Sequence, residues 1–176
     1  FQLETTQRLA LKAAAVLNVT SDHLDRYASL ADYAAAKARI FTHCDTAVIN
    51  LDDPLVVAMQ HATPRTFTYS LQTAAAADFS LATNPETHQP WLTRRGEVLL
   101  PAAAIKLAGL HNVANALAAL ALGEALRLPR AAMLEELQEF AGLPHRTEWV
   151  ADVDAVRYLN DSKGTNVGAT LAAVAG

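Results

Sequence analysis

The first 70 residues alternate between short apolar runs and longer segments in which apolar residues recur at helical spacing. The short runs predict buried strands and the longer segments predict helices. Ser29, followed by Asp32, can cap one helix, and Pro54 suits the first turn of another. We expect helices at 7–15, at 29–41 and from Asp52-Asp53-Pro54 onward, and strands at 15–19, 46–50 and 65–70. This alternation is typical of an α/β fold, with a mostly parallel sheet flanked by helices.

The hydrophobic pattern changes after residue 78. Residues 79–101 predict antiparallel strands with a turn at 94–97, which we interpret as a small antiparallel β addition to the main sheet. Two helices are expected next, one that follows Leu110-His111-Asn112 and runs to residue 126, and one at 129–140. The alanine-rich segment 73–77 is expected to form a surface loop.

A domain boundary is predicted at Gly142-Leu143-Pro144, which interrupts the helical pattern. Residues 1–143 would form one domain, and residues 144–176 the start of a second. The second segment predicts a hairpin at 146–159 with its turn near 152–154, a polar loop at 160–166 and a helix from residue 167 onward.

Composition narrows the classes of partner. The chain has 176 residues, 52% of them hydrophobic, and a net charge of −4. This charge gives no electrostatic case for nucleic acid or a membrane surface, and no apolar run reaches the roughly 20 residues of a membrane helix. The one cysteine, Cys44, fits a reducing cytoplasm, and we interpret it as a buried structural thiol. The chain lacks an initiator Met, and we interpret it as a piece of a longer protein.

Two polar segments near the N-terminus carry candidate chemistry. In the loop at 18–27, His23 stands among carboxylates and could bind a divalent cation, with Asp22 or Asp25 orienting its ring; a surface loop with a capping Asp is the alternative. Lys37 lies in an alanine-rich helix, where a solvated surface lysine is the simplest reading. A buried lysine with a lowered pKa could instead react with carbon dioxide and become an anionic carbamate.

Two further polar segments lie downstream. His111 and Asn112 stand where a helix begins, and Asn112 alone is best explained as its N-cap. The amide of Asn115, one turn later, has the donor and acceptor that the edge of an adenine ring requires. Residues 160–166 form a polar loop with a glycine between a strand and a helix, an arrangement that binds phosphate or ribose. The phosphate-loop pattern Gly-x-x-x-x-Gly-Lys-Ser/Thr occurs nowhere in the chain.

Six strings, taken in order, resemble the Mur ligase family, and most closely its glutamate-adding branch. They cover essentially the whole chain: residues 1–6, 17–27, 35–37, 111–119, 142–146 and 160–166. The departure within them is slight, since Gly164 stands where Ala is common. The family has a uridine-nucleotide domain, a central ATPase domain and a Rossmann-like C-terminal domain. The resemblance therefore implies a truncated central domain over residues 1–143 and the first βα part of the third domain over residues 144–176.

The resemblance also implies roles for particular residues. His23 would be a Mg²⁺ ligand, and Lys37 would be carbamylated and bind a second Mg²⁺ through its carbamate. The remaining roles concern the nucleotide and the incoming amino acid. Asn115 and Arg146 would contact adenine with Asn112 beside them, Asp161 would hold the ribose, and Lys163 and Thr165 would face the phosphate and glutamate region.

The implied reaction is amide formation, in which ATP and Mg²⁺ activate a carboxylate as an acyl phosphate. The implied substrates are UDP-N-acetylmuramoyl-L-alanine and glutamate, by family default the D form, in a monomeric cytoplasmic enzyme without nucleic-acid partners or membrane insertion. Because the phosphate loop is missing, we expect the isolated chain to be inactive. The alternatives are another Mur ligase, folylpolyglutamate synthase, or a regulatory domain that keeps the fold without catalysis.

Overall fold

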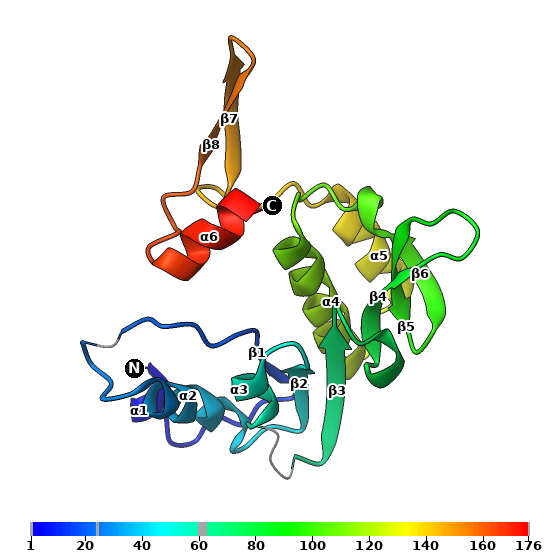
Figure 1. Cartoon of the computed structure of the whole chain (residues 1–176). Coiled ribbons are helices and arrows are strands. Elements are labelled where there is room, and N and C mark those ends of the chain that lie inside the picture. The colour runs from blue at the N-terminus through cyan, green and yellow to red at the C-terminus, as the bar shows by residue number, and fades with distance from the viewer. Residues whose placement is uncertain (1, 24, 60–62, 176) are drawn as a thin grey trace.

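The structure, a computed structural model, describes residues 2–23, 25–59 and 63–175. Within these residues, strands form a six-stranded sheet in the order β1-β2-β3-β4-β5-β6 and a separate hairpin of β7 and β8 (Figure 1). Strands β1 to β4 run parallel, and β5 and β6 add to β4 in antiparallel fashion. The strands span Ala14–Val16, Thr46–Asn50, Arg65–Ser70, Phe79–Thr83, Pro90–Arg94, Glu97–Pro101, Glu148–Val153 and Val156–Asn160.

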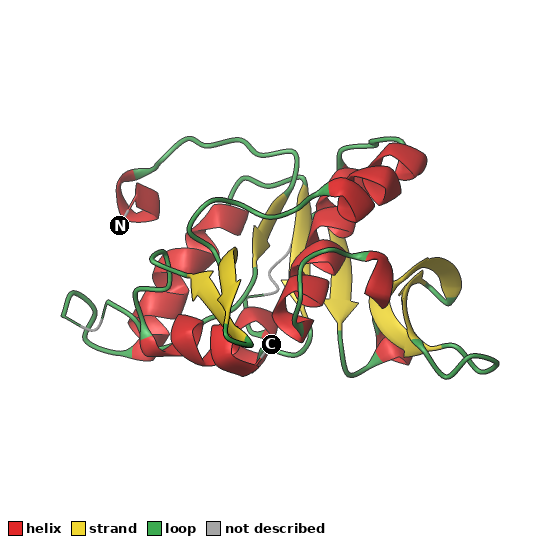
Figure 2. Cartoon of the chain, turned by 90° about the horizontal axis from the view of Figure 1, so that it is seen from above, coloured by secondary structure: helices red, strands yellow, loops and turns green. Residues whose placement is uncertain are grey.

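Helices lie on both sides of the sheet when the molecule is seen from above (Figure 2). The α-helices α1 to α6 span Gln2–Thr5, Leu30–Ala38, Pro54–Val57, Leu110–Ala125, Arg130–Glu139 and Val167–Ala175. Short 3₁₀ turns η1 to η3 span Arg39–Phe41, Ala74–Ala76 and Ala102–Ala104. The predicted α/β class, with its parallel sheet and antiparallel addition, is thus confirmed.

The helix-start signals read from the sequence operate as expected at two helices. The Ser29 hydroxyl accepts a hydrogen bond from the Asp32 N–H at 3.1 Å and caps α2. Asp53 caps α3, because its Oδ1 accepts from the N–H groups of the second and third residues after it, and Pro54 occupies the first helical position.

Alternation along β2 explains why the middle of that strand, Ala47-Val48-Ile49, is continuously apolar. Val48 packs into a core cluster beneath α4, whereas Ile49 packs into a second cluster beneath α2 and α3. Neighbouring strand residues point to opposite faces, so a sheet covered on both faces needs apolar residues at every position. Leu117 and Leu120 of α4 are 0% and 1% exposed and fill the first cluster together with Tyr69.

An ion pair joins the antiparallel part of the sheet to α4. The Arg94 guanidinium of β5 donates to the Glu124 carboxylate, with Nε 2.8 Å from Oε2. Both side chains are mostly shielded from solvent. The hydrogen bond from Arg94 lowers the pKa of Glu124, and the same bond raises the pKa of Arg94.

The helix predicted at 7–15 is wrong. Residues 7–10 form no regular structure, Leu11 makes a β-bridge with Cys44, and β1 occupies Ala14–Val16 instead of 15–19. The alanines there favour a helix by propensity, but the Leu11 N–H donates to the His43 carbonyl at 2.9 Å. Pairing with the chain that leads into β2 thus overrides local propensity.

The C-terminal segment forms the hairpin and helix expected from its pattern. The turn lies at Asp154 and Ala155, one residue later than predicted, and both have the positive φ that a two-residue hairpin turn requires. The hairpin stands away from the six-stranded sheet (Figure 1). The domain boundary at residue 143 stays a prediction. In the described part of the chain, no helix has the length and apolarity to cross a membrane.

Candidate functional site

The loop that follows β1 is held by side chains from the ends of the neighbouring strands. The Asn50 amide donates to the Leu17 carbonyl at 2.8 Å, and the Tyr69 hydroxyl donates to the same carbonyl at 3.3 Å. Two residues after Leu17, the Val19 N–H donates to Asp53 Oδ2 at 2.7 Å. Carboxyl ends of parallel strands meet at one edge of a sheet, which is the usual ligand-binding edge of such folds.

Tyr69 keeps its phenolic proton at neutral pH, as tyrosines do, and its surroundings disfavour ionisation further. Burial raises the pKa of this phenol well above its ordinary value, and the neighbouring Asp52 and Asp53 carboxylates raise it further. The Asp52 carboxylate also holds part of the backbone in place. Asp52 accepts hydrogen bonds from the Ser70 hydroxyl and from the Leu71 N–H at 2.6 Å, so it fixes the chain that leaves β3.

His23 lies in this loop beside Asp22. Asp22 Oδ1 accepts a hydrogen bond from the His23 N–H at 2.9 Å, and Oδ2 lies 3.6 Å from the imidazole Nε2. His23 has φ = 54°, a left-handed conformation that is uncommon outside glycine. Asp22, one of the two carboxylates that could orient the ring, thus lies within ion-pair distance of the imidazole, and the choice between Asp22 and Asp25 stays a prediction.

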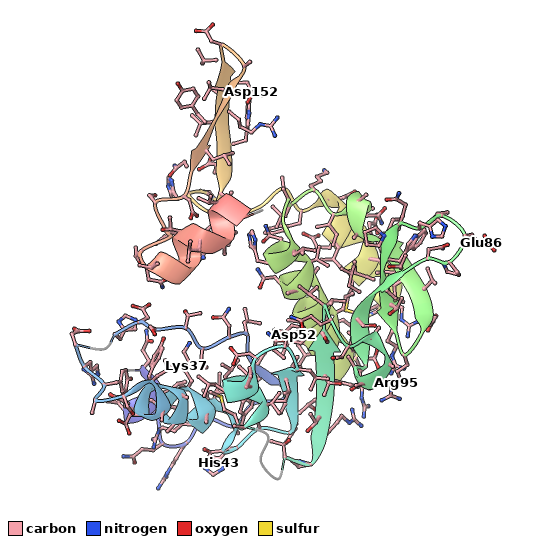
Figure 3. The ribbon with its side chains drawn as sticks, viewed as in Figure 1. Lys37, His43, Asp52, Glu86, Arg95 and Asp152 are labelled. Carbon is pink, nitrogen blue, oxygen red and sulfur yellow. The ribbon has the colours of Figure 1, made fainter. Side chains whose placement is uncertain are left out.

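Lys37 of α2 contacts the same tyrosine ring as His23. Its Nζ lies 4.9 Å from the centroid of the Tyr33 ring, one helical turn earlier, which is a cation–π contact. The His23 ring meets the same tyrosine edge-on, with centroids 5.9 Å apart. Figure 3 labels Lys37 on α2, beneath the loop that leaves β1. His23 and Lys37, which were predicted to act together, therefore both contact Tyr33. Tyr33 is not among the residues predicted from the sequence, although its i, i+4 spacing to Lys37 is a signal for such a contact.

The residues after residue 143 that we predicted to bind the nucleotide lie on two loops that are hydrogen-bonded to each other. The Thr147 N–H donates to Asp161 Oδ1 at 3.0 Å, and the Lys163 N–H donates to the His145 carbonyl at 3.1 Å. Arg146, which precedes Thr147, is exposed, as are Lys163 and Thr165. Thr165 lines an open hollow of about 460 Å³ at the start of α6.

The polar loop at 160–166 also reaches the loop that carries His23. The Asn166 side chain donates from Nδ2 to Asp22 Oδ2 at 2.9 Å. This bond joins residues separated by 144 positions and brings the polar segment 160–166 against the polar segment 18–27.

Asn112 and Asn115 lie at the start of α4. The interpretation of Asn112 as the N-cap is wrong, because the helix is capped at Gly109, where φ = 95° suits glycine. Asn112 lies three residues further on, and its Nδ2 donates back to the Ala108 carbonyl at 2.7 Å. Asn115 is exposed one turn later, so its amide is accessible to a ligand.

A complete metal cage is not present in the described residues. They contain no group of three or more His, Cys, Asp or Glu side chains placed to hold a metal ion. Mg²⁺ requires close to octahedral coordination, commonly by a few carboxylates, waters and phosphate oxygens. His23 and Lys37, as a carbamate, could therefore supply only part of such a site.

The comparison with protein families decides the family. A family described as the Mur ligase middle domain matches residues 2–123, which is more than half of the chain. The chain belongs to the Mur ligase family. The chain is 53% identical over 176 residues to a UDP-N-acetylmuramoylalanine–D-glutamate ligase of Nitrosococcus oceani. A protein of the same description from Methylobacillus flagellatus is 49% identical over 177 aligned residues. The chain is fully covered in both alignments but spans only 38% and 39% of these relatives.

Solved structures of Mur ligases share the fold. MurF from Acinetobacter baumannii superposes with a TM-score of 0.72 at 20% identity, covering 92% of this chain and 36% of that one. The UDP-N-acetylmuramate-alanine ligase MurC from Thermotoga maritima superposes with a TM-score of 0.65 at 25% identity, covering 88% of this chain and 35% of that one. The Mur ligase resemblance read from the sequence is thus confirmed.

Proposed function

We propose that this chain belongs to an ATP-dependent ligase that joins D-glutamate to UDP-N-acetylmuramoyl-L-alanine. The observation that carries the proposal is the 53% identity over all 176 residues to the ligase of that description from Nitrosococcus oceani. The contact of His23 and Lys37 with Tyr33 supports it, because it gathers two of the residues that the chemistry needs.

The proposed reaction has two steps. The terminal phosphoryl group of ATP moves to the carboxylate of the alanyl substrate, which gives an acyl phosphate and ADP. The glutamate amine then attacks the carbonyl carbon, the bond from that carbon to the phosphate oxygen breaks, and inorganic phosphate leaves as the amine loses a proton. Orientation of the amine against the acyl phosphate and exclusion of water are the main contributions of the protein.

His23 and Lys37 are the proposed metal-binding residues. The His23 imidazole would hold one Mg²⁺, and Lys37, carbamylated on Nζ, would hold a second, with the remaining ligands drawn from phosphate oxygens, water and groups outside this chain. When bound, Mg²⁺ supplies positive charge that offsets the charge on the transferred phosphoryl group. Tyr33 packs against both side chains and limits how far either can turn.

The nucleotide would lie between the start of α4 and the loops after residue 143. Asn115 and Arg146 are proposed to contact adenine, with Asn112 beside them, and Asp161 is proposed to hold the ribose. Support comes from the exposure of Asn115 and Arg146 and from the hydrogen bond that fixes Asp161 to the Thr147 N–H.

Lys163 and Thr165 are proposed to face the phosphate and incoming glutamate, and both are exposed on the loop before α6. We further propose that the enzyme works as a cytoplasmic monomer. Cys44 is a buried cysteine that forms no disulfide within the chain, which is consistent with a reducing compartment.

Replacing Lys37 with Ala in the full-length ligase tests the proposal. Loss of the carbamate should lower the rate of phosphate release about a hundredfold or more, because a charge that holds the metal is lost. Short-chain carboxylic acids, added at millimolar concentration, should partly restore the rate. Lys12→Ala is the matched control, because Lys12 is an exposed lysine paired with Asp45 and should leave the rate unchanged.

The amino-acid acceptor is tested in the same assay. Phosphate release with the alanyl nucleotide should require D-glutamate and should not occur with alanine or diaminopimelate in its place. A Lys37→Ala enzyme with the wild-type rate, or a wild-type enzyme indifferent to D-glutamate, would contradict the proposal.

A further inference from the structure

The Asn166 side chain makes two hydrogen bonds of different kinds. Its Oδ1 accepts from the Ala169 N–H at 2.8 Å, so it caps the first turn of α6. Its Nδ2 donates to Asp22 Oδ2 at 2.9 Å, across to the loop that carries His23. An aspartate would cap the helix equally well but has no N–H to donate, so the amide is required only by the bond to Asp22.

Asp22 passes this contact on to His23. One carboxylate oxygen accepts the His23 N–H, and the other, which accepts from Asn166, lies 3.6 Å from the His23 imidazole Nε2. Asp22 therefore touches both the backbone and the ring of His23. If Asn166 holds the carboxylate in one rotamer, it also restricts the position of the imidazole.

A second contact brings α6 against the same loop. A Cβ built on Gly168 would lie 3.4 Å from both Cβ and Oγ1 of Thr20. The first turn of α6 thus packs closely against the chain three residues before His23, and the Asn166–Asp22 bond lies within a packed junction.

We propose that Asn166 is a positioning residue that couples docking of residues 144–176 to the orientation of His23. When α6 packs on Thr20, the Asn166 amide reaches Asp22, and Asp22 then holds His23 in place. This inference rests on the proposed function, because it assigns His23 to the reaction centre. Hydrogen bonds to a charged carboxylate are roughly twice as strong as neutral ones, which suits a contact that must form each time the segment docks.

A double-mutant cycle in the full-length ligase tests the coupling. Asn166→Asp keeps the helix cap but sets two carboxylates against each other, so kcat should fall about tenfold or more. The KM for ATP should change less than kcat, and the thermal midpoint should stay close to that of the wild type. In Asp22→Asn/Asn166→Asp the donor and acceptor are exchanged, the new amide oxygen at position 22 can still accept from the His23 N–H, and much of the lost kcat should return.

A disulfide tests the junction without relying on ligase activity. Thr20→Cys with Gly168→Cys places two Cβ atoms about as far apart as the roughly 3.8 Å of natural disulfides. Oxidised dithiothreitol should cross-link this pair, detected as a loss of two thiols on titration, whereas either single variant should not cross-link. Adding Asn166→Asp should slow the cross-linking severalfold.

The outcomes separate the two proposals. Three results would each overturn the positioning role. They are a wild-type kcat in Asn166→Asp, no recovery of kcat in Asp22→Asn/Asn166→Asp, and a rate of disulfide formation that Asn166→Asp leaves unchanged. A wild-type enzyme without D-glutamate ligase activity would overturn the proposed function instead, and the cross-linking result would still decide whether Asn166 joins the two segments.

Discussion

Replacing Asp53 with Ala removes the acceptor for three backbone N–H groups at once. Oδ1 accepts from Leu55 and Val56 at 2.9 and 3.2 Å, and Oδ2 accepts from Val19 at 2.7 Å. An N-cap contributes about 1 kcal/mol and a hydrogen bond to a charged group about 1.5–3 kcal/mol. Since Val19 is only 7% exposed, its N–H would lose its partner with little access to water.

The free energy of unfolding should therefore fall by about 3 kcal/mol in Asp53→Ala. Urea denaturation followed by circular dichroism measures this value, and the midpoint should fall by about 1–2 M at an ordinary slope. Asp53→Ser separates the two contributions, because a serine can cap α3 but is too short to reach Val19. It should lose about half as much stability as the alanine variant.

Asp45→Ala is the matched control, because Asp45 makes an exposed ion pair with Lys12 and should contribute less than about 1 kcal/mol. Wild-type stability in Asp53→Ser would show that the bond to Val19 contributes nothing, and equal losses in the two variants would show that the cap contributes nothing. A loss in Asp53→Ala no larger than in Asp45→Ala would refute the whole account of how the loop after β1 is held.

Three further predictions concern other parts of the fold. Leu117→Ala, at a position with 0% exposure, should lower the free energy of unfolding in urea by about 2–5 kcal/mol, and a smaller loss would mean that α4 is not the centre of the core. The pKa of Glu124 is lowered from 4.5 by Arg94, so the stability from this pair is present above pH 4.5 and is lost as the pH falls through the lowered pKa. Thermal midpoints measured from about pH 6 to about pH 3 should fall more steeply in the wild type than in Glu124→Gln, and parallel curves would contradict the ion pair. Burial raises the pKa of Cys44, so its thiol should react slowly with Ellman's reagent at pH 8 in the folded chain and rapidly in urea, and fast reaction without urea would contradict its burial.

Strands β2 and β3 have the predicted bounds. The centre of β2 is continuously apolar because both of its faces are covered, whereas β3 alternates, with Phe67 and Tyr69 on its buried face. The error at residues 7–15 arose where alanines favoured a helix and the pairing partner lay far along the chain, at Cys44. Local pattern carries no information on such a partner.

In the candidate site, the residue types could likewise be predicted from the sequence, whereas the contacts between distant residues could not. His23 and Lys37 could be proposed from residue type and from the family resemblance, whereas their meeting on Tyr33 needed the packing of α2 against the loop. The bond from Asn166 to Asp22 spans 144 positions and follows no spacing rule. Asn112 failed as a cap because Gly109, with its positive φ, begins the helix three residues earlier.

The position of His23 depends on residues of other strands and loops more than on β1, the strand that precedes its loop. β1 is three residues long and lies at the edge of the sheet, so it can do little to hold the loop that follows it. The loop is instead held by Asn50 at the end of β2, by Asp53 after it, by Tyr69 of β3 and by Asn166 before α6. A change that loosens any of these side chains should therefore disturb His23 even when β1 stays paired.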